Sequence, residues 1–168
     1  TERQGLAKLS AVQLPIERTL VASILADAHV EQTLTKLVGL GLVEPSRSGT
    51  DQRSAFRVSR ILAPLLKPVL SEVDWQATYQ AATQQLYQTW WQEAETSSEA
   101  QLLEMVRLGL LAHEKDVTVV VGNALATHWI NNARFIEALE LCQQILETFE
   151  SYQILGSIAR AEVVLGYV

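Results

Sequence analysis

Cysteine is almost absent from this chain. The one thiol, Cys142, cannot form a disulfide within the chain, and a protein without disulfides fits a reducing, cytoplasmic setting. The sequence also has no run of 18 apolar residues, and no charged start followed by an apolar signal region. We therefore predict neither a membrane span nor secretion.

Positive charge is also scarce. The chain has 13 Lys and Arg against 19 Asp and Glu, which gives a net charge of −6. Because phosphate backbones are bound mainly through Lys and Arg, this balance disfavours nucleic-acid partners. Hydrophobic residues make up 48% of the 168 residues, with only 8 Gly and 4 Pro, so we expect a globular chain with a substantial core.

Patterns that carry catalysis or bind metals are missing as well. The histidines His29, His113 and His128 lie far apart, and none forms a His-x-x-x-His pair or a Cys/His cluster. Cys142 lies beside leucines in a helical pattern, where a buried, unreactive thiol is expected. The sequence contains no Gly-x-Ser-x-Gly nucleophile motif and no phosphate-binding loop ending in Lys-Ser/Thr. We predict a non-enzymatic protein without catalytic residues, cofactor or metal.

What the sequence does have is helical periodicity with one short interruption. Apolar residues at three- and four-residue spacing predict a helix within 5–13, a second from Pro15 to residue 26, and a third after Asp27, closed by Gly39 and Gly41. Residues 42–44 and 54–58 read as two short strands around a Ser/Gly/Thr-rich turn. Three short helices followed by a hairpin resemble a winged-helix domain, which we place at 1–72.

From Ile61 onward only helices are expected. The segment 61–70 has an apolar helical face, with Pro64 in its first turn and Pro68 ending or kinking it. Asp74 is expected to cap a long helix, and Ser97 or Ser98 the next one. Further helices are expected from Asp116 to residue 132, at 132–150 and at 151–168.

The segment Ala124–Glu147 resembles a tetratricopeptide repeat. It has small residues where paired helices approach, at Ala126 and Ala138, a small residue at the turn, Ala133, and the aromatic Phe135 before Glu137-Ala138-Leu139. A partial copy follows about 33 residues later, close to the period of such repeats. The resemblance covers 116–168, with a weaker copy at 74–114. It implies a domain of antiparallel helical hairpins over 73–168, an α-solenoid fragment cut off at its C-terminus.

A winged helix followed by helical repeats resembles the middle of signal-transducing ATPases with numerous domains, the NB-ARC-type class. Val58-Ser59-Arg60 stands where that family often has Met-His-Asp, so the histidine that would approach a nucleotide is missing. The chain starts at Thr1 and ends at Val168 in an apolar, helix-like stretch, so we expect it to be a piece of a longer protein. The resemblance implies a regulatory interaction module of a multidomain signalling protein, whose partner is a protein, a peptide or a neighbouring domain.

The alternative is a transcription regulator that binds DNA through the winged helix. The third helix offers Gln32, Thr33, Thr35 and Lys36 for base contacts, offset by Glu31. The wing and the segment after it contain a basic patch that would bind DNA phosphates or, equally, dock against an acidic neighbouring domain. Its residues are Arg47, Arg53, Arg57 and Arg60.

Two further surfaces are candidates for protein binding. In tetratricopeptide arrays the first helices line a groove, and the repeat register assigns to it Asn123, Thr127, Asn131, Gln153 and Arg160. Alternatively, further helical repeats that follow this segment in a longer parent protein would occupy the same groove, which would then bind no partner. The neighbours Trp90 and Trp91 point about 100° apart on a helix, so one of them is expected at an edge or interface.

Overall fold

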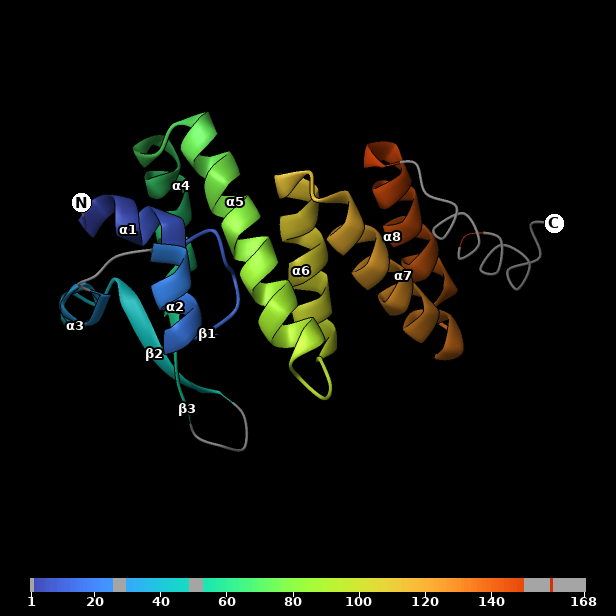
Figure 1. Ribbon diagram of the computed structural model, residues 1–168, viewed down its shortest axis with the longest axis horizontal. Helices are drawn as coiled ribbons and strands as arrows, with labels where there is room; N and C mark the ends of the chain where they lie inside the picture. The colour runs from blue at the N-terminus through green and yellow to red at the C-terminus, as the bar shows by residue number, and fades with distance from the viewer. Residues whose placement is uncertain (1, 26–29, 49–52, 150–157, 159–168) are drawn as a thin grey trace.

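The computed structural model describes residues 2–25, 30–48, 53–149 and 158, and the fold is given for these residues. Helices dominate, and they are accompanied by a small antiparallel sheet. Two parts follow one another along the long axis of Figure 1: an N-terminal unit, residues 2–70, and a helical array, residues 72–149. The prediction of a mainly helical chain with a short hairpin is confirmed at this level.

The N-terminal unit packs three helices around the sheet. In chain order its elements are α1 (Glu2–Leu9), β1 (Ile16–Glu17), α2 (Arg18–Leu25), α3 (Val30–Gly39), β2 (Val43–Ser48) and β3 (Arg53–Val58). The strand order is β1-β3-β2. Ile16 pairs with Phe56 on one side of β3, and Val43 pairs with Val58 on the other. All four side chains are buried, so the sheet contributes directly to the core.

Pro15 does not open a helix, and that prediction is wrong. The chain first pairs with β3 through Ile16 and Glu17, and α2 begins only at Arg18. A proline fits the position before a strand because it is not required to donate a hydrogen bond there. The burial of Ile16 against the sheet favours the strand over an earlier helix start.

The link between the two parts is a broken helix. It consists of the 3₁₀ turn η1 (Arg60–Leu62), the short helix α4 (Ala63–Leu66) and the 3₁₀ turn η2 (Lys67–Val69). Pro64 lies in the first turn of α4 and Pro68 in that of η2, as predicted for residues that begin or interrupt helices. The expected continuous apolar face is wrong in part, because Ile61 and Leu65 are 83% and 65% exposed while Leu66 and Leu70 are buried.

The helical array contains α5 (Glu72–Leu86), a π-helical turn η3 (Tyr87–Gln92), α6 (Glu99–Ala112), α7 (Lys115–Asn131) and α8 (Phe135–Thr148). Ser71, not Asp74, caps α5, because its hydroxyl accepts the backbone N–H of Asp74 in the first turn. Ser98 caps α6 as predicted, in a reciprocal capping box with Gln101. The predicted helix at 151–168 lies outside the described residues except for Ile158, which is helical.

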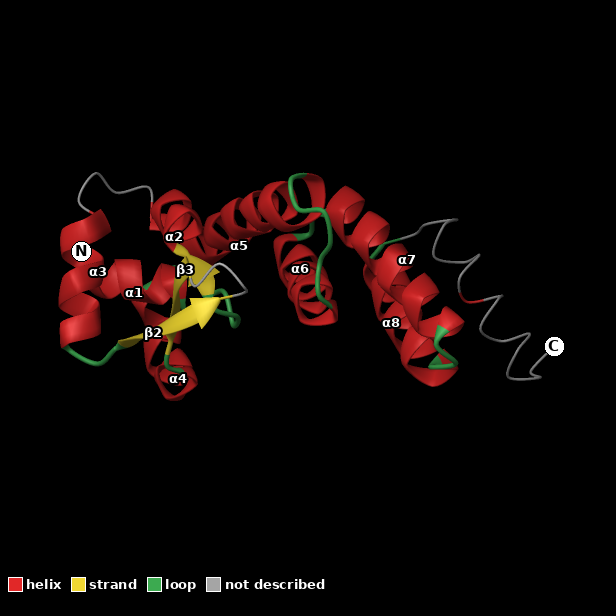
Figure 2. Ribbon diagram, turned by 90° about the horizontal axis from the view of Figure 1, so that it is seen from below, coloured by secondary structure: helices red, strands yellow, loops and turns green. Residues whose placement is uncertain are grey.

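Successive helices of the array pack as neighbours. Figure 2 shows α5 and α7 toward one side of the array and α6 and α8 toward the other. Gly109 on α6 lies against Thr118 of α7, and Gly122 on α7 lies against Ile145 of α8, so closely that a Cβ would collide at either position. Ala133 turns the chain between α7 and α8 with a left-handed φ of 61°. The predicted hairpin over Ala124–Glu147 is thus present as two antiparallel helices.

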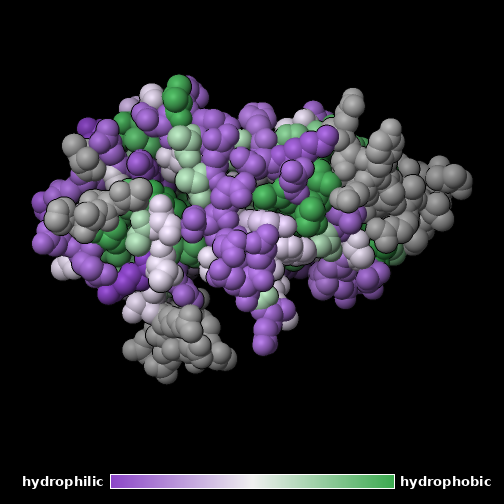
Figure 3. Space-filling view, in the orientation of Figure 1, coloured by the Kyte–Doolittle hydropathy of each residue, from purple (hydrophilic) through white to green (hydrophobic). Residues whose placement is uncertain are grey.

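One continuous hydrophobic core runs through both parts. It includes Leu20 and Ile24 of α2 and Leu86 of α5, and extends to Ile145 of α8. Helix α2 packs directly against α5. On the face seen in Figure 3, polar side chains cover most of α5, and apolar side chains come to the surface on both sides of it.

Candidate interaction site

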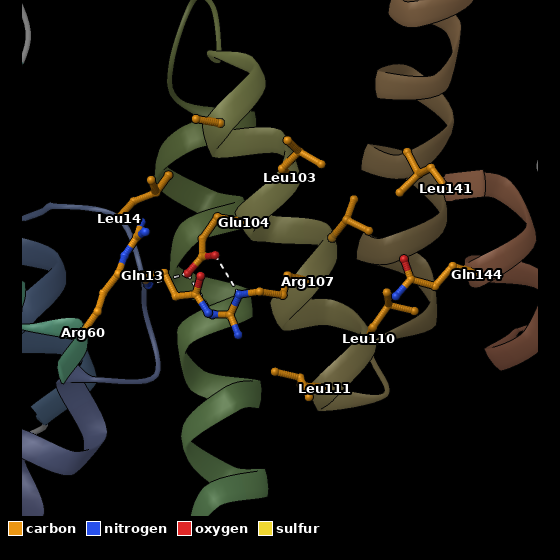
Figure 4. A pocket seen from close by; sticks show the side chains of 12 residues that line it. Gln13, Leu14, Arg60, Leu103, Glu104, Arg107, Leu110, Leu111, Leu141 and Gln144 are labelled. Atoms are coloured by element: carbon orange, nitrogen blue, oxygen red, sulfur yellow. Dashed lines mark hydrogen bonds and ion pairs between the residues drawn. The ribbon is translucent and has the colours of Figure 1, made fainter. Parts of the chain in front are cut away.

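A hollow of about 530 Å³ lies where the N-terminal unit meets the helical array. Figure 4 shows its lining side chains, which come from the α1–β1 loop, from η1, from one side of α6 and from α8. Helix α7 contributes none of them. The lining residues are Gln13, Leu14, Arg60, Ala100, Leu103, Glu104, Val106, Arg107, Leu110, Leu111, Leu141 and Gln144.

The wall formed by α6 is largely apolar. Its apolar lining residues Ala100, Leu103, Val106 and Leu110 lie three or four positions apart, so together with Leu111 they form one stripe along the helix. Leu103 is 39% exposed and Leu111 is 41% exposed, although both lie among leucines. An apolar stripe left partly open in this way can bind the apolar side of another molecule.

An ion pair between Arg107 and the buried Glu104, both part of this wall, joins the two parts. The Nε of Arg107 donates to Oε2 of Glu104 at 2.7 Å, and its Nη2 donates to Oε1 at 2.8 Å. The Glu104 side chain is only 5% exposed. Its Oε1 also accepts the backbone N–H of Gln13 at 2.6 Å, and Nη2 of Arg107 donates to the carbonyl of Ala11 at 2.5 Å. The pair on α6 therefore holds the α1–β1 loop in place.

Other contacts support the same junction. The indole Nε1 of Trp75 on α5 donates to the carbonyl of Lys67 in η2 at 2.9 Å. Tyr79, one turn further along α5, stacks on Trp75 with ring centroids 5.5 Å apart. Burial raises the pKa of the Tyr79 hydroxyl above 10.0, and the positive charge of Arg107 acts in the opposite direction.

Arg60 is the cation of the hollow that has no carboxylate partner among the described residues. It is exposed, and Figure 4 shows it next to Leu14. Within the hollow the charges of Glu104 and Arg107 cancel each other. The uncompensated charge of the lining is therefore one positive charge on the side formed by the N-terminal unit.

A second charged cluster lies away from the hollow, around the α7–α8 turn. Arg134 donates to both carboxylate oxygens of Glu99, at 2.8 and 3.0 Å, and to Glu137 at 3.0 Å. Its guanidinium also lies 4.8 Å from the ring centroid of Trp129. These hydrogen bonds from Arg134 hold the pKa values of Glu99 and Glu137 below their ordinary value of 4.5. The cluster ties the start of α6 to the turn between α7 and α8.

The groove predicted from the repeat register does not coincide with the hollow. Asn123, Thr127 and Asn131 all lie on α7, and none of them lines it. Asn123 and Thr127 are half-buried and already have partners, whereas Asn131 is exposed. The other two candidates, Gln153 and Arg160, lie outside the described residues.

The tryptophan pair divides as expected for helix neighbours. Trp90 is buried, and Trp91 is half-buried and stacks on Tyr87 with ring centroids 6.4 Å apart. Neither lines the hollow. Their segment forms the π-helical turn η3 in place of a regular helix end.

The predicted basic patch is not a set of free cations. Arg57 pairs with Glu44 across the β2–β3 hairpin at 3.0 Å, and Arg60 points into the hollow. The side chains of Arg47 and Arg53 lie outside the described part of the chain. On α3, Lys36 pairs with Glu2, and Glu31 pairs with Arg18. This pairing lowers the positive charge that α3 offers to phosphates.

Among the described residues, no three His, Cys, Asp or Glu side chains come together as a metal site. Cys142 is buried. His113 ends α6 with a left-handed φ of 53° and packs edge-on against Phe149, while His29 is outside the described part. In the same part of the chain, no helix is both long and apolar enough for a bilayer crossing.

Comparison with protein-family models, with curated proteins and with solved structures gave no match.

Proposed function

We propose that the chain is a non-enzymatic interaction and regulatory module of a larger multidomain signalling protein, and that it binds a protein or peptide in the hollow. The observation that carries the proposal is that both parts of the chain line the hollow. Leu14 and Arg60 come from the N-terminal unit, and Leu103 and Leu141 come from the helical array. A ligand in the hollow contacts both parts at once, so it can favour one arrangement of them over another.

The arrangement of elements supports the finer family assignment that we propose. Three helices with a β1-β3-β2 sheet fit a winged-helix-like unit. The helical array fits tetratricopeptide-like hairpins, because Ala126 and Ala138 are fully buried on facing helices. A connector that joins such units suits relay between neighbouring domains, and the Glu104–Arg107 pair is the contact through which relay would pass.

The proposal is tested by photo-crosslinking at the hollow. A benzoyl-phenylalanine replaces Leu103 in the chain expressed in its own cells, and irradiation is expected to give a discrete protein adduct or a link to another part of the parent chain. The matched control places the same group at Leu40, an exposed leucine outside the hollow. Absence of an adduct at position 103, or identical adducts at both positions, contradicts the proposal. Nucleotide hydrolysis by the purified chain contradicts its non-enzymatic part.

A further inference from the structure

We propose that the partner bound in the hollow is an amphipathic α-helix of about three turns, with a carboxylate placed against Arg60. This inference rests on the proposed function and names the chemistry of its ligand. It follows from the length of the apolar stripe, from the charge of the lining and from the surfaces that the chain itself exposes.

The shape of the lining fits a helix. The α6 stripe from Ala100 to Leu111 is about 16 Å long at 1.5 Å per residue, which is three helical turns. In Figure 4, Leu141 of α8 lies on one side of the α6 stripe, and Leu14 and Arg60 lie on the opposite side. A helix can therefore lie along the stripe between these two flanks. A helix with apolar residues at i, i+3 or i+4 and i+7 presents side chains at the same spacing as Leu103, Val106 and Leu110 of α6.

The charge of the lining selects an acidic residue on that helix. Arg60 has no carboxylate partner in the described structure, whereas Glu104 and Arg107 satisfy each other. A helix that covered the hollow with only neutral residues would desolvate the Arg60 guanidinium without compensation. An Asp or Glu on the flank of the helix that faces the N-terminal unit avoids this cost and fixes the rotation of the helix about its axis.

A second copy of this chain does not offer such a helix within its described residues. The large apolar side chains that are exposed there are Leu40, Ile61, Leu65, Val73, Leu103, Leu111, Val120 and Ile136. Only α6 and the short segment of η1 and α4 contribute two of them each. No described helix other than α6 exposes an apolar stripe of three turns, so the described part of a second copy does not supply the occupant.

The test is a display selection with the whole chain as bait. The library consists of random peptides of about 16 residues, long enough for the three turns and flexible ends. We expect the enriched peptides to share apolar residues at helical spacing and one acidic residue, and to gain helical circular dichroism on binding. Binding of these peptides is expected to weaken at least about tenfold in Leu103→Glu and Leu111→Glu. Leu40→Glu is the control and is expected to bind them unchanged.

The carboxylate is tested by a double-mutant cycle. Arg60→Gln is expected to weaken binding by about two- to fivefold, the range for a partly exposed ion pair. Replacing the acidic residue of the peptide by glutamine is expected to do the same in the wild type and to have no further effect in Arg60→Gln. Equal effects of the peptide change in both proteins overturn the assignment of the carboxylate to Arg60.

The remaining outcomes separate this inference from the proposed function. Peptides that bind at the leucines but stay extended, together with cross-links at position 103, overturn the helix and leave the interaction module standing. Failure to enrich any peptide, together with such cross-links, also overturns the inference alone. Failure to enrich peptides without cross-links overturns both.

Discussion

Glu104 is a carboxylate inside the protein, and its surroundings explain how it can stay there. Three hydrogen bonds reach its oxygens, two from the guanidinium of Arg107 and one from the backbone of Gln13. A buried charge that loses its partner keeps its desolvation cost and loses the compensating attraction. The two residues are therefore expected to behave as a unit in stability measurements.

Replacing Arg107 by methionine is expected to lower the free energy of unfolding by about 3 kcal/mol, because it leaves the Glu104 carboxylate unpaired and the Ala11 carbonyl without its donor. Urea unfolding followed by circular dichroism measures the change. The matched control is Arg18→Met, which removes an exposed pair with Glu31 and is expected to cost less than about 1 kcal/mol. Equal losses in the two variants would contradict a special role for the buried pair.

The Arg134 cluster predicts a pH-dependent contribution to stability. The pKa values of Glu99 and Glu137 are lowered in the folded protein, so the unfolded chain binds more protons as the pH falls below their ordinary value of 4.5. Stability from the cluster is therefore fully present above that value and is lost as the pH falls through the lowered pKa values. Arg134→Gln is expected to destabilise the protein more at pH 7 than at pH 3, as measured by urea unfolding at both. A loss of the same size at both pH values would show that the two carboxylates do not contribute.

Helices of the array are held at short distance by glycine. Gly109 of α6 faces the Thr118 hydroxyl and Cβ of α7, so the two backbones approach where a side chain would not fit. Thr118 cannot simply move aside, because its hydroxyl donates to the carbonyl of Glu114 and the residue is fully buried. Overpacking of this kind is destabilising even though alanine favours the helix more than glycine does.

Gly109→Ala is accordingly expected to destabilise the protein by about 1–3 kcal/mol in thermal or urea unfolding. Adding Thr118→Ala, which removes the colliding hydroxyl, is expected to restore part of the loss. Gly39→Ala is the control, since nothing lies near a Cβ there, and it is expected to be neutral or slightly stabilising. A Gly109→Ala protein as stable as Gly39→Ala would disprove the tight contact.

The helices of the array could be predicted from the sequence because their apolar residues recur at helical spacing and serine caps mark α6. Local patterns failed where a distant segment decides the structure. Pro15 looked like a helix start, but pairing of Ile16 with Phe56 makes a strand.

The hollow could not be predicted, because Leu14, Arg60 and Leu103 are far apart in the sequence and meet only in the fold. The one local signal was Glu104-x-x-Arg107 within an apolar helix, which indicates a paired charge at an interface.

Across the whole molecule, the charge pattern and the continuous core favour the proposed connector over the alternative of a nucleic-acid-binding protein. The net charge is −6, and the cations on and around α3 are engaged with Glu2 and Glu31. Binding to DNA depends on unpaired Lys and Arg side chains, which displace the counterions of the phosphates. The surface of α3 offers few such side chains. The apolar core, in contrast, passes without a break from α2 into α5.

The purified chain is therefore expected to give no gel shift with duplex DNA, even at low salt, where electrostatic binding is strongest. The same experiment with a protein of known DNA affinity serves as the positive control. A shift that disappears as salt is raised would favour the alternative of a winged-helix regulator. Loss of that shift in Lys36→Gln would place the contact on α3.

The contact between α6 and the α1–β1 loop also determines which substitutions relatives of this chain can accept. Both hydrogen bonds from the ion pair to the loop end on backbone atoms, the N–H of Gln13 and the carbonyl of Ala11. The ion pair itself therefore restricts the loop sequence only at position 13, which cannot be proline. Because loss of one partner leaves Glu104 or Arg107 uncompensated, positions 104 and 107 are expected to change together. Relatives of this chain are accordingly expected to keep a Glu-x-x-Arg pair at the middle of this helix even where the loop sequence differs.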